Sequence, residues 1–465
     1  MIRYVSTRGG GEPLSFEDVL LAGLAPDGGL YVPEAFPELD LNALKGRTYG
    51  EIALAVMYPF VEGCISRDDF AAMIKQAYSG FRHDKIVPLR ALKDNHYILE
   101  QFYGPTIAFK DVALQLLGRF FDYVLKKRGA HITIVGATSG DTGSAAIEGC
   151  RHSDQLDLFI LHPKGRVSDV QRRQMTTVAA ENVYNIAIDG TFDDCQNLVK
   201  AMFADQDFRR SLNLSAVNSI NWARIMAQTV YYVSAALELG APDTQVTFVV
   251  PTGNFGNVLA GYYARRMGLP IKLVVASNEN DILTRFFESG EMKAAGVIAT
   301  NSPSMDIEIS SNFERYLYDM LGRDADTLVA IMRRFKDEGS FDVAPDRFAA
   351  AKRDFTAQRA SQTEVLDVIE TVFAETGYVI DPHTAVGVKA ALVLKSAGPI
   401  VTLATAHPAK FPDAVEQAIG QRPELPEHLS DLFDKEERIT ELPNNLKTVQ
   451  DFVRAHSKII EEGKK

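Results

Sequence analysis

The sequence predicts an α/β protein with two open, mostly parallel sheets, preceded by an α+β extension. Strands and helices alternate at close spacing from about residue 96 to residue 204, and a second such series starts at residue 245. The first 90 residues lack this rhythm. Close strand–helix alternation indicates parallel strands, because each parallel pair needs a crossover connection that is usually a helix.

Apolar runs bounded by turn residues define the expected elements. The first helix of the series ends in Lys126-Lys127-Arg128 and is followed by Gly129, a good stop signal. We expect strands at 97–102, 131–135, 156–161, 183–188, 245–250, 271–275 and 399–404, and helices at 110–128, from 144, at 168–180, 193–204, 221–239 and 256–267.

These elements predict three domains. Residues 1–90 form an N-terminal domain, and residues 131–214 form a small α/β domain. Residues 91–130 and 215–465 form a large domain, with a mainly helical, charged insertion near 305–375 on its periphery. The tail from about residue 420 reads as polar and helical.

Composition narrows the function class. The 465 residues are 46% hydrophobic and 24% charged, as in ordinary globular proteins, and the net charge of −12 argues against a nucleic-acid partner. No apolar run is long enough to span a membrane. The distant cysteines Cys64, Cys150 and Cys195 and the absence of a signal-peptide pattern favour a reducing, cytoplasmic location. The histidines show no metal-binding spacing, so we expect no metal. Monomer and homodimer fit equally well.

Lys110 stands at the predicted start of the helix after Gly104-Pro105. The helix dipole is positive at that end, so a lysine is unusual there. Burial between Phe109 and Val112 would disfavour the charged ammonium, and a lysine in such a place is suited to Schiff-base chemistry. The alternative is a lysine whose stem merely covers apolar surface.

Three loops follow predicted strands, at the edge where ligands bind in open α/β sheets. In the first loop, glycines and helix-start amides could cradle a phosphate, although a plain Gly/Asn-rich turn is equally compatible. This first loop is Gly253-Asn254-Phe255-Gly256-Asn257.

The second loop, 138–143, contains Ser139, Asp141 and Thr142 and suits a small substrate's carboxylate or phosphate. Its alternative is helix capping by Thr142 or Ser139. In the third loop, the Thr405 hydroxyl faces the ligand edge, and His407 is either an acid–base group or, more commonly for such a histidine, a structural donor.

Asn221 and Arg224 lie on one face at the start of a predicted helix, at positions i and i+3. That face could hold a phosphate, with the guanidinium as a bidentate fork. A well-capped helix with a surface arginine is the alternative.

Together these segments resemble the pyridoxal-phosphate (PLP) enzymes of the tryptophan-synthase-β type, PLP fold type II. The closer resemblance is to threonine synthases of the longer class, which have an N-terminal extension. The motifs run in family order along most of the chain. They are 6–9, 24–30, 105–111, 136–143, 218–224, 251–257, 381–385 and 404–411.

The resemblance implies a PLP-dependent carbon–oxygen lyase that converts O-phospho-L-homoserine and water into L-threonine and phosphate. It implies that Lys110 carries the cofactor as a Schiff base and shuttles protons, while residues 253–257 cradle the cofactor phosphate. Thr405 would form a hydrogen bond with the pyridine nitrogen. Asp141 occupies the position near the phenolic oxygen where many relatives use asparagine.

The substrate's carboxylate and phosphate are assigned to four residues. These are Ser139, Thr142, Asn221 and Arg224. Two alternatives remain open: a threonine/serine dehydratase or phospho-amino-acid lyase on the same fold, and a non-catalytic phosphate- or nucleotide-binding protein.

Overall fold

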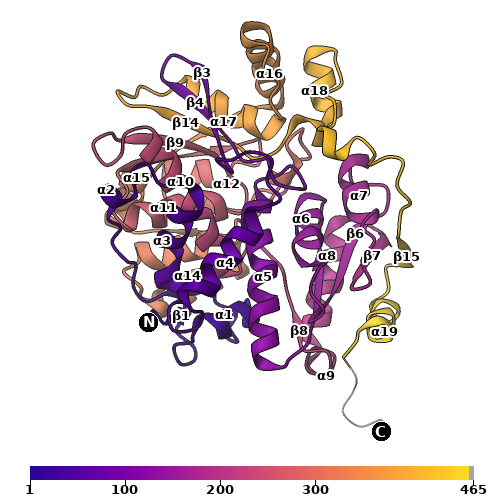
Figure 1. The fold of residues 1–465 in the computed structure, drawn as a ribbon. Coiled ribbons are helices and arrows are strands. Elements are labelled where there is room, and N and C mark those ends of the chain that lie inside the picture. Colours follow the sequence, from indigo (N-terminus) through magenta and orange to yellow (C-terminus); the bar gives the residue numbers. More distant parts are fainter. Residues whose placement is uncertain (460–465) are drawn as a thin grey trace. The chain divides into compact units, whose positions relative to one another are not determined.

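The computed structural model describes residues 1–459, and contacts within the chain group them into two compact units (Figure 1). The first unit comprises Met1–Val19, Leu24–Phe109 and Ser219–Pro423. The second comprises Leu20–Gly23, Lys110–Asn218 and the chain from Glu424 onward. The helix α1 (Phe16–Ala22) therefore contributes residues to both units.

A six-stranded sheet forms the centre of the first unit, in the order β13-β10-β9-β14-β4-β3. Every neighbouring pair is parallel except β3–β4, so the predicted mostly parallel sheet is confirmed. The strands are β3 (Leu89–Lys93), β4 (His96–Glu100), β9 (Val246–Pro251), β10 (Ile271–Ser277), β13 (Phe355–Arg359) and β14 (Ile400–Ala404).

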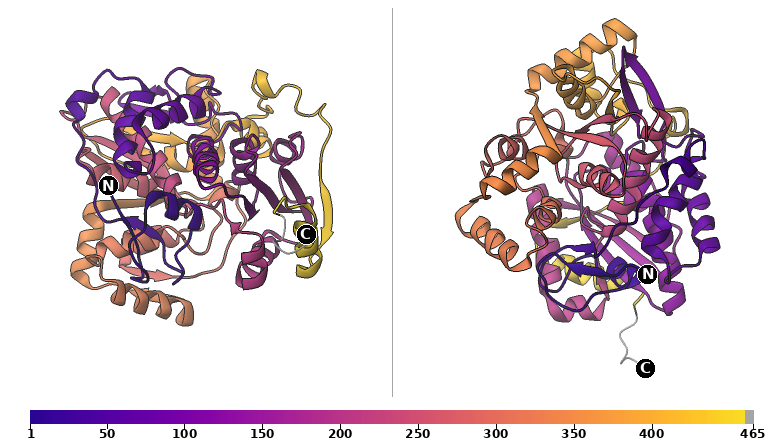
Figure 2. Two further views of the ribbon diagram at one scale, coloured as in Figure 1. Left: turned by 60° about the horizontal axis from the view of Figure 1, so that its bottom comes forward. Right: turned by 90° about the vertical axis from the view of Figure 1, so that its left-hand side faces the viewer.

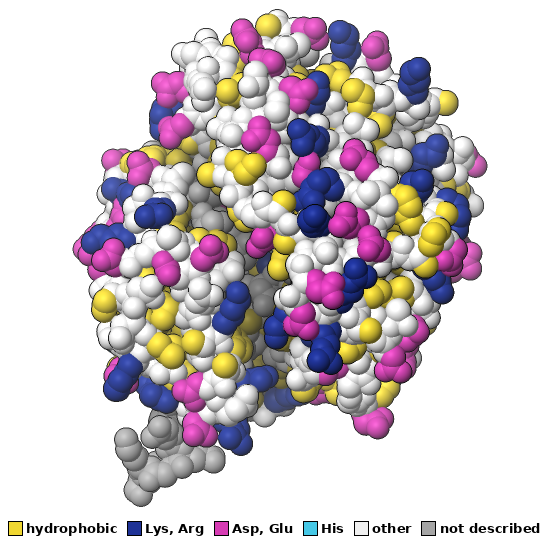
Figure 3. Space-filling model, turned by 180° about the vertical axis from the view of Figure 1, so that it is seen from behind, with side chains coloured by type: hydrophobic (Ala, Val, Ile, Leu, Met, Phe, Trp, Pro, Cys, Tyr) yellow, Lys and Arg dark blue, Asp and Glu magenta, His cyan; other side chains and the backbone are white. Residues whose placement is uncertain are grey.

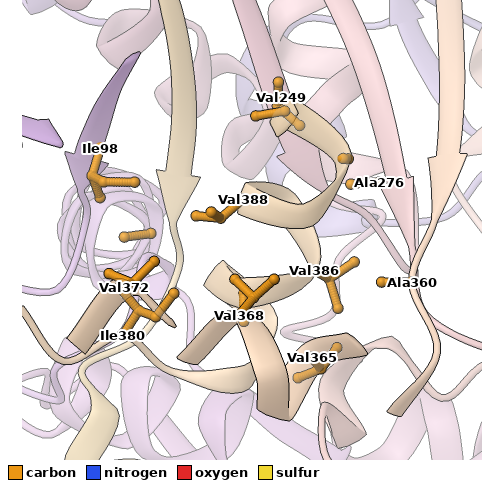
Figure 4. Packing of buried hydrophobic residues seen from close by; sticks show 14 of the residues in the cluster. Ile98, Val249, Ala276, Ala360, Val365, Val368, Val372, Ile380, Val386 and Val388 are labelled. Atoms are coloured by element: carbon orange, nitrogen blue, oxygen red, sulfur yellow. The ribbon is translucent and has the colours of Figure 1, made fainter. Parts of the chain in front are cut away.

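An apolar cluster joins this sheet to α16 (Gln362–Thr376) and α17 (Pro382–Leu392). Figure 4 shows Val386 and Val388 of α17 lying among Val249 of β9 and side chains of α16. Gly387 lets α17 approach β14, since a Cβ there would lie 2.7 Å from the Thr402 methyl group. Each buried valine contributes about 1.5–3 kcal/mol, so this interface positions the C-terminal edge of β14 firmly.

The N-terminal segment combines an antiparallel pair, β1 (Tyr4–Ser6) with β2 (Tyr31–Pro33), and short helices. The helix α3 begins with a capping box between Thr48 and Glu51 and packs on α10. The helices of this segment that follow α1 are α2 (Leu41–Leu44), α3 (Tyr49–Val61) and α4 (Arg67–Tyr78). Later helices of the first unit are α10 (Trp222–Glu238), α11 (Gly256–Arg266) and α12 (Ile282–Ser289).

The segment 305–375 is mainly helical, as the sequence predicts, and also contains two short strands. It contains α13 (Phe313–Met320), α14 (Ala325–Glu338) and α15 (Pro345–Asp354), but β12 (Ser340–Asp342) pairs with β11 (Glu291–Lys293). The strand β13 then returns to the edge of the large sheet beside β10. The sequence does not mark β13, because a short edge strand of mixed polarity has no distinctive pattern.

The second unit has a five-stranded, all-parallel sheet in the order β15-β7-β6-β5-β8. Its strands are β5 (Ile132–Ala137), β6 (Leu156–Pro163), β7 (Val183–Asp189), β8 (Leu214–Ser215) and β15 (Thr440–Pro443). Its helices are α5 (Lys110–Arg128), α6 (Asp141–Cys150), α7 (Asp169–Thr176), α8 (Phe192–Ala204), α9 (Gln206–Ser211) and α19 (Leu446–His456). The helices α5 and α6 pack closely where Gly149 meets the Leu114 carbonyl.

The chain after residue 423 belongs to this second unit by its contacts. The strand β15 pairs with β7, and Val449 and Val453 of α19 enter the apolar cluster of the sheet. The yellow segment lies beside these strands in Figures 1 and 2. The sequence predicts a polar, helical tail within the larger domain. It does not mark β15, because a four-residue edge strand ending in proline has no clear periodic pattern.

Charged side chains of both signs are interspersed over the face shown in Figure 3. Ion pairs on the protein surface include Lys164 with Glu441 at 2.6 Å and Lys435 with Asp431 at 2.8 Å. Exposed pairs of this kind contribute little to stability. Within residues 1–459, none of the helices combines the length and the apolar character needed to cross a bilayer.

Candidate active site

The glycine-rich loop 252–255 connects β9 to α11 in the first unit. Phe255 occupies the N-cap position with φ of 62°, in the left-handed region, and its ring is buried against Phe313 and Phe355. Such a backbone conformation costs about 1–2 kcal/mol in a residue other than glycine. The aromatic packing holds the strained turn, which leaves the first amides of α11 directed out of the helix start.

A second segment surrounds this loop through backbone contacts. The Ser310 hydroxyl donates to the Gly253 carbonyl at 2.8 Å, and the Asn312 N–H donates to the Asn254 carbonyl at 3.1 Å. A Cβ on Gly253 would lie 3.1 Å from Cα of Met305. A side chain at position 253 would therefore require this neighbouring backbone to shift by a few tenths of an ångström. The predicted approach of a ligand to the loop stays a prediction.

Asn257, in the first turn of α11, is held by two tyrosines. Its side-chain oxygen accepts hydrogen bonds from Tyr231 and Tyr232, the latter at 3.1 Å. Its Nδ2 donor is buried without a hydrogen-bond partner among the described residues. A buried N–H group beside a helix N-terminus is a donor that an anion would satisfy.

Thr405 follows β14 and is 7% exposed. Its carbonyl accepts the Phe109 N–H at 2.8 Å, and Ala108 forms a bridge with Ala406. The residue covalently following Phe109 is Lys110, so the start of α5 is tied in sequence to the edge that carries Thr405.

His407 has a structural role. Its Nδ1 accepts the Ala409 N–H at 3.2 Å and caps the short helix η2 (Pro408–Lys410). Its ring packs edge-on against Phe102. The structural alternative raised for His407 is therefore the one that these contacts support.

Asn221 and Arg224 lie at the start of α10. Asn221 is the N-cap and accepts the Ala223 N–H at 3.1 Å, as the capping alternative predicts. Arg224, however, is not a surface residue, because it is 3% exposed. Its Nε and Nη1 have no hydrogen-bond partner among the described residues, and burial lowers the pKa of the guanidinium to about 10. A buried cation with unsatisfied donors suits an anionic ligand.

Lys110 is the first residue of α5 and is 9% exposed. Its ammonium lies 3.0 Å from Oδ2 of Asp141, whose Oδ1 accepts the Gln171 side-chain N–H at 2.8 Å. The interpretation of Lys110 as a stem covering apolar surface is therefore wrong. The sequence suggested a desolvated amine but did not identify the carboxylate that compensates its charge.

In the loop before α6, Thr138 supplies the local hydrogen bonds. Its hydroxyl accepts the N–H groups of Gly140 and Gly143 at 3.0 and 2.9 Å. Gly140 is the N-cap of α6 and no side chain caps this helix, so the expectation of capping by Ser139 or Thr142 was wrong. Ser139 is exposed and Thr142 is half-buried.

Sequence reasoning missed Thr138, Gln171 and Ser310 as supports of these loops. Gln171 lies inside a helix and Ser310 inside an irregular segment, and neither position has a distinguishing pattern. Among residues 1–459, no group of three or more His, Cys, Asp or Glu side chains could hold a metal ion.

Each unit, taken by itself, provides a group that suits one part of a phosphorylated aldehyde. The first unit provides a glycine loop at a helix N-terminus with the unsatisfied Asn257 amide, and the second provides a buried primary amine. The first group suits a phosphate, and the amine is the nucleophile that joins an aldehyde.

Comparisons with known proteins agree with this chemistry. The family described as "Threonine synthase N terminus" matches residues 3–78, "Pyridoxal-phosphate dependent enzyme" matches residues 83–351, and "Threonine synthase, C-terminal" matches residues 384–453. The threonine synthase of Pseudomonas aeruginosa is 54% identical over 462 residues, which cover 98% of each chain. That of Schizosaccharomyces pombe is 46% identical, with 90% of each chain covered. The crystal structure of PLP-bound threonine synthase from Brucella melitensis superposes with a TM-score of 0.96 at 54% identity, covering 98% of this chain and 100% of that one.

Proposed function

The chain belongs to the threonine synthase family, and we propose that it converts O-phospho-L-homoserine and water into L-threonine and inorganic phosphate. It is a PLP-dependent lyase with the fold that the sequence predicts. The observation that carries the proposed residue roles is the buried Lys110 amine with its own counter-charge at the first position of a long helix.

Lys110 is the proposed catalytic base. A helix fixes its backbone, and the carboxylate of Asp141 holds its Nζ at 3.0 Å. When bound, PLP supplies an aldehyde carbon that joins an amino group and an electron-withdrawing ring that accepts charge from the substrate Cα. Lys110 Nζ would take the Cα proton and assist the removal of a proton at Cβ. Phosphate would leave from Cγ, which gains a proton, water would add its hydroxyl at Cβ, and a proton would return to Cα.

Asp141 has a positioning role in this scheme. It accepts hydrogen bonds from Lys110 and Gln171 on separate oxygens, so its carboxylate is fixed in direction. An aspartate facing the phenolic oxygen of the cofactor would repel it, whereas an aspartate paired with an ammonium is compensated. We therefore assign Asp141 to the orientation of Lys110.

The phosphate of PLP is assigned to residues 253–257. The free amides at the start of α11 and the dipole of that helix favour an anion there. Thr405 is assigned to the pyridine nitrogen. A neutral hydroxyl would not keep that nitrogen protonated, so the ring withdraws charge less strongly and Lys110 does more of the proton transfer.

The substrate's own anionic groups are assigned to Arg224 and Asn221 in the first unit and to Ser139 and Thr142 in the second. The buried guanidinium of Arg224 is the strongest member of this set, because burial in a dry site raises the strength of its pairing with phosphate. The side-chain oxygen of Asn221 accepts the Ala223 N–H at the start of α10.

Two measurements on purified protein test the proposal. The PLP-loaded protein should be yellow, and borohydride reduction followed by peptide mapping should leave the cofactor on Lys110. With O-phospho-L-homoserine it should release threonine and phosphate in equal amounts. Ketoacid and ammonia in place of threonine would establish a dehydratase, and a label on another lysine would remove Lys110 from its role.

The cellular location and assembly are further parts of the proposal. The three cysteines form no disulfide bond within the described residues, and two of them are buried, which fits a reducing cytoplasm. Light scattering after size-exclusion chromatography distinguishes a monomer from a homodimer.

A further inference from the structure

The motif Asp381-Pro382-His383-Thr384-Ala385 has no part in the function proposed above, yet its polar side chains are deeply buried. It forms the N-terminal turn of α17 in the first unit, where Asp381 is 0% and His383 is 3% exposed. Buried carboxyl and imidazole groups are costly unless each polar atom has a partner. Their partners therefore indicate what the motif does.

The hydrogen bonds of Asp381 fix the tautomer of His383. The carboxylate accepts the backbone N–H groups of His383 and Thr384 at 3.0 and 2.9 Å, and also the Thr384 hydroxyl. Nδ1 of His383 lies 2.7 Å from the same carboxylate and is therefore the donor. Nε2 then carries the lone pair. The ring is also packed against Phe411, with centroids 4.5 Å apart.

Nε2 of His383 accepts the backbone N–H of Ser304 at 3.1 Å. Ser304 is the middle residue of the short helix η1 (Pro303–Met305). This turn lies directly on the glycine loop, because a Cβ on Gly253 would be 3.2 Å from the Ser304 carbonyl oxygen and 3.1 Å from Cα of Met305.

The turn is held on its other side by a buried polar network. The Asn278 side chain donates to the Ser302 hydroxyl at 3.0 Å and to Asp306 at 2.8 Å. The turn η1 is therefore fixed at both flanks and at its centre, and its central anchor is the imidazole of His383.

We propose that His383 is a positioning residue for the cofactor phosphate: by accepting the Ser304 N–H it presses η1 against Gly253 and so fixes the loop 253–257. The inference rests on the proposed function, because it takes that loop as the phosphate site of PLP. His383 touches neither cofactor nor substrate in this scheme, and it acts through the backbone of residues 303–305.

A matched pair of variants separates this role from general packing. In His383→Gln the amide oxygen reaches the place of Nε2 and can still accept the Ser304 N–H. In His383→Asn the shorter amide reaches only the place of Nδ1, so it keeps the bond to Asp381 and leaves the Ser304 N–H unsatisfied. The Kd for PLP should rise about tenfold in His383→Asn and stay within about threefold of wild type in His383→Gln.

PLP uptake by the resolved apoprotein, followed by absorbance, gives the Kd, and a melting curve of each apoprotein gives its stability. Thr384→Val is the structural control: it removes one bond to Asp381, so it should lower the melting temperature without changing the Kd. Asp381→Asn removes the same hydrogen bond by another change. An asparagine at position 381 allows the other tautomer of His383, in which Nε2–H faces the Ser304 N–H, so the Kd of this variant for PLP should also rise about tenfold.

Equal Kd values for His383→Asn and His383→Gln would overturn the inference. If His383→Asn does not fold, an Asp381→Asn protein that binds PLP like wild type would overturn it instead. These results leave the proposed function intact if wild type binds PLP and forms threonine. A wild-type protein that takes up no PLP overturns both.

Discussion

Replacing Arg224 with methionine tests whether a buried charge is kept for a substrate anion. The guanidinium is 3% exposed, and two of its nitrogens have no hydrogen-bond partner among the described residues. Methionine fills the volume of the stem without the charge. We expect the apoprotein to become more stable while the enzyme loses activity, a combination typical of a site strained for function.

The pKa of Arg224 gives the size of the effect. Burial lowers it from the ordinary range of arginine to about 10, a difference that corresponds to about 3 kcal/mol. Because the folded-state pKa lies below the unfolded one, the charged form is penalised in the folded state. The penalty is complete below pH 10 and disappears as the pH rises through the ordinary pKa of arginine. At pH 7 the Arg224→Met apoprotein should gain up to about 3 kcal/mol.

Urea unfolding of the apoprotein can be followed through Trp222, the only tryptophan, which is 1% exposed and lies two residues before Arg224 in α10. The loss of a buried charge-assisted contact to phosphate should lower kcat/KM about 100-fold. Arg224→Lys, which keeps a charge but loses the fork, should remain as stable as wild type. An Arg224→Met protein that is less stable than wild type, or fully active, would refute the reasoning.

Three further outcomes are expected. Asp141→Asn leaves the Lys110 ammonium buried without its counter-charge and should destabilise the apoprotein by about 3 kcal/mol in urea unfolding; an unchanged midpoint would show that the pair is not structural. Gly253→Ala brings a Cβ within 3.1 Å of Met305 Cα and should weaken PLP binding about tenfold in equilibrium dialysis, whereas wild-type affinity would show that the loop has room. Burial lowers the pKa of His96 from 6.5 to about 4, so stability should fall by about 2 kcal/mol between pH 7 and pH 5; His96→Gln should flatten that part of the curve, and an equal slope in both proteins would rule His96 out.

The periodic elements could be predicted because their patterns are local. The buried strands β5, β6, β9 and β14 coincide with apolar runs bounded by turn residues. The edge strands β13 and β15 could not be predicted in this way, because a short, partly exposed strand is recognised only by the neighbour with which it pairs.

The site divides in the same manner. Lys110 and the glycine loop were predicted because a helix start and a strand-to-helix turn leave marks in the sequence. Which partner each group finds was not predictable, since Asp141, Gln171 and Ser304 are defined by tertiary contacts. The burial of Arg224 could not be predicted either, because the sequence shows on which face of the helix it lies but not what covers that face.

The construction of the second unit from distant segments has a consequence for synthesis on the ribosome. Its sheet needs β15 to cover the edge of β7, and its apolar cluster needs Val449 and Val453 of α19. Strands β5 to β8 therefore leave the exit tunnel more than 200 residues before their last partners, since β8 ends at Ser215 and β15 starts at Thr440. During that interval the edge of β7 lacks its partner strand, and an unpaired edge of this kind is a site for wrong pairing that chaperones protect in nascent chains.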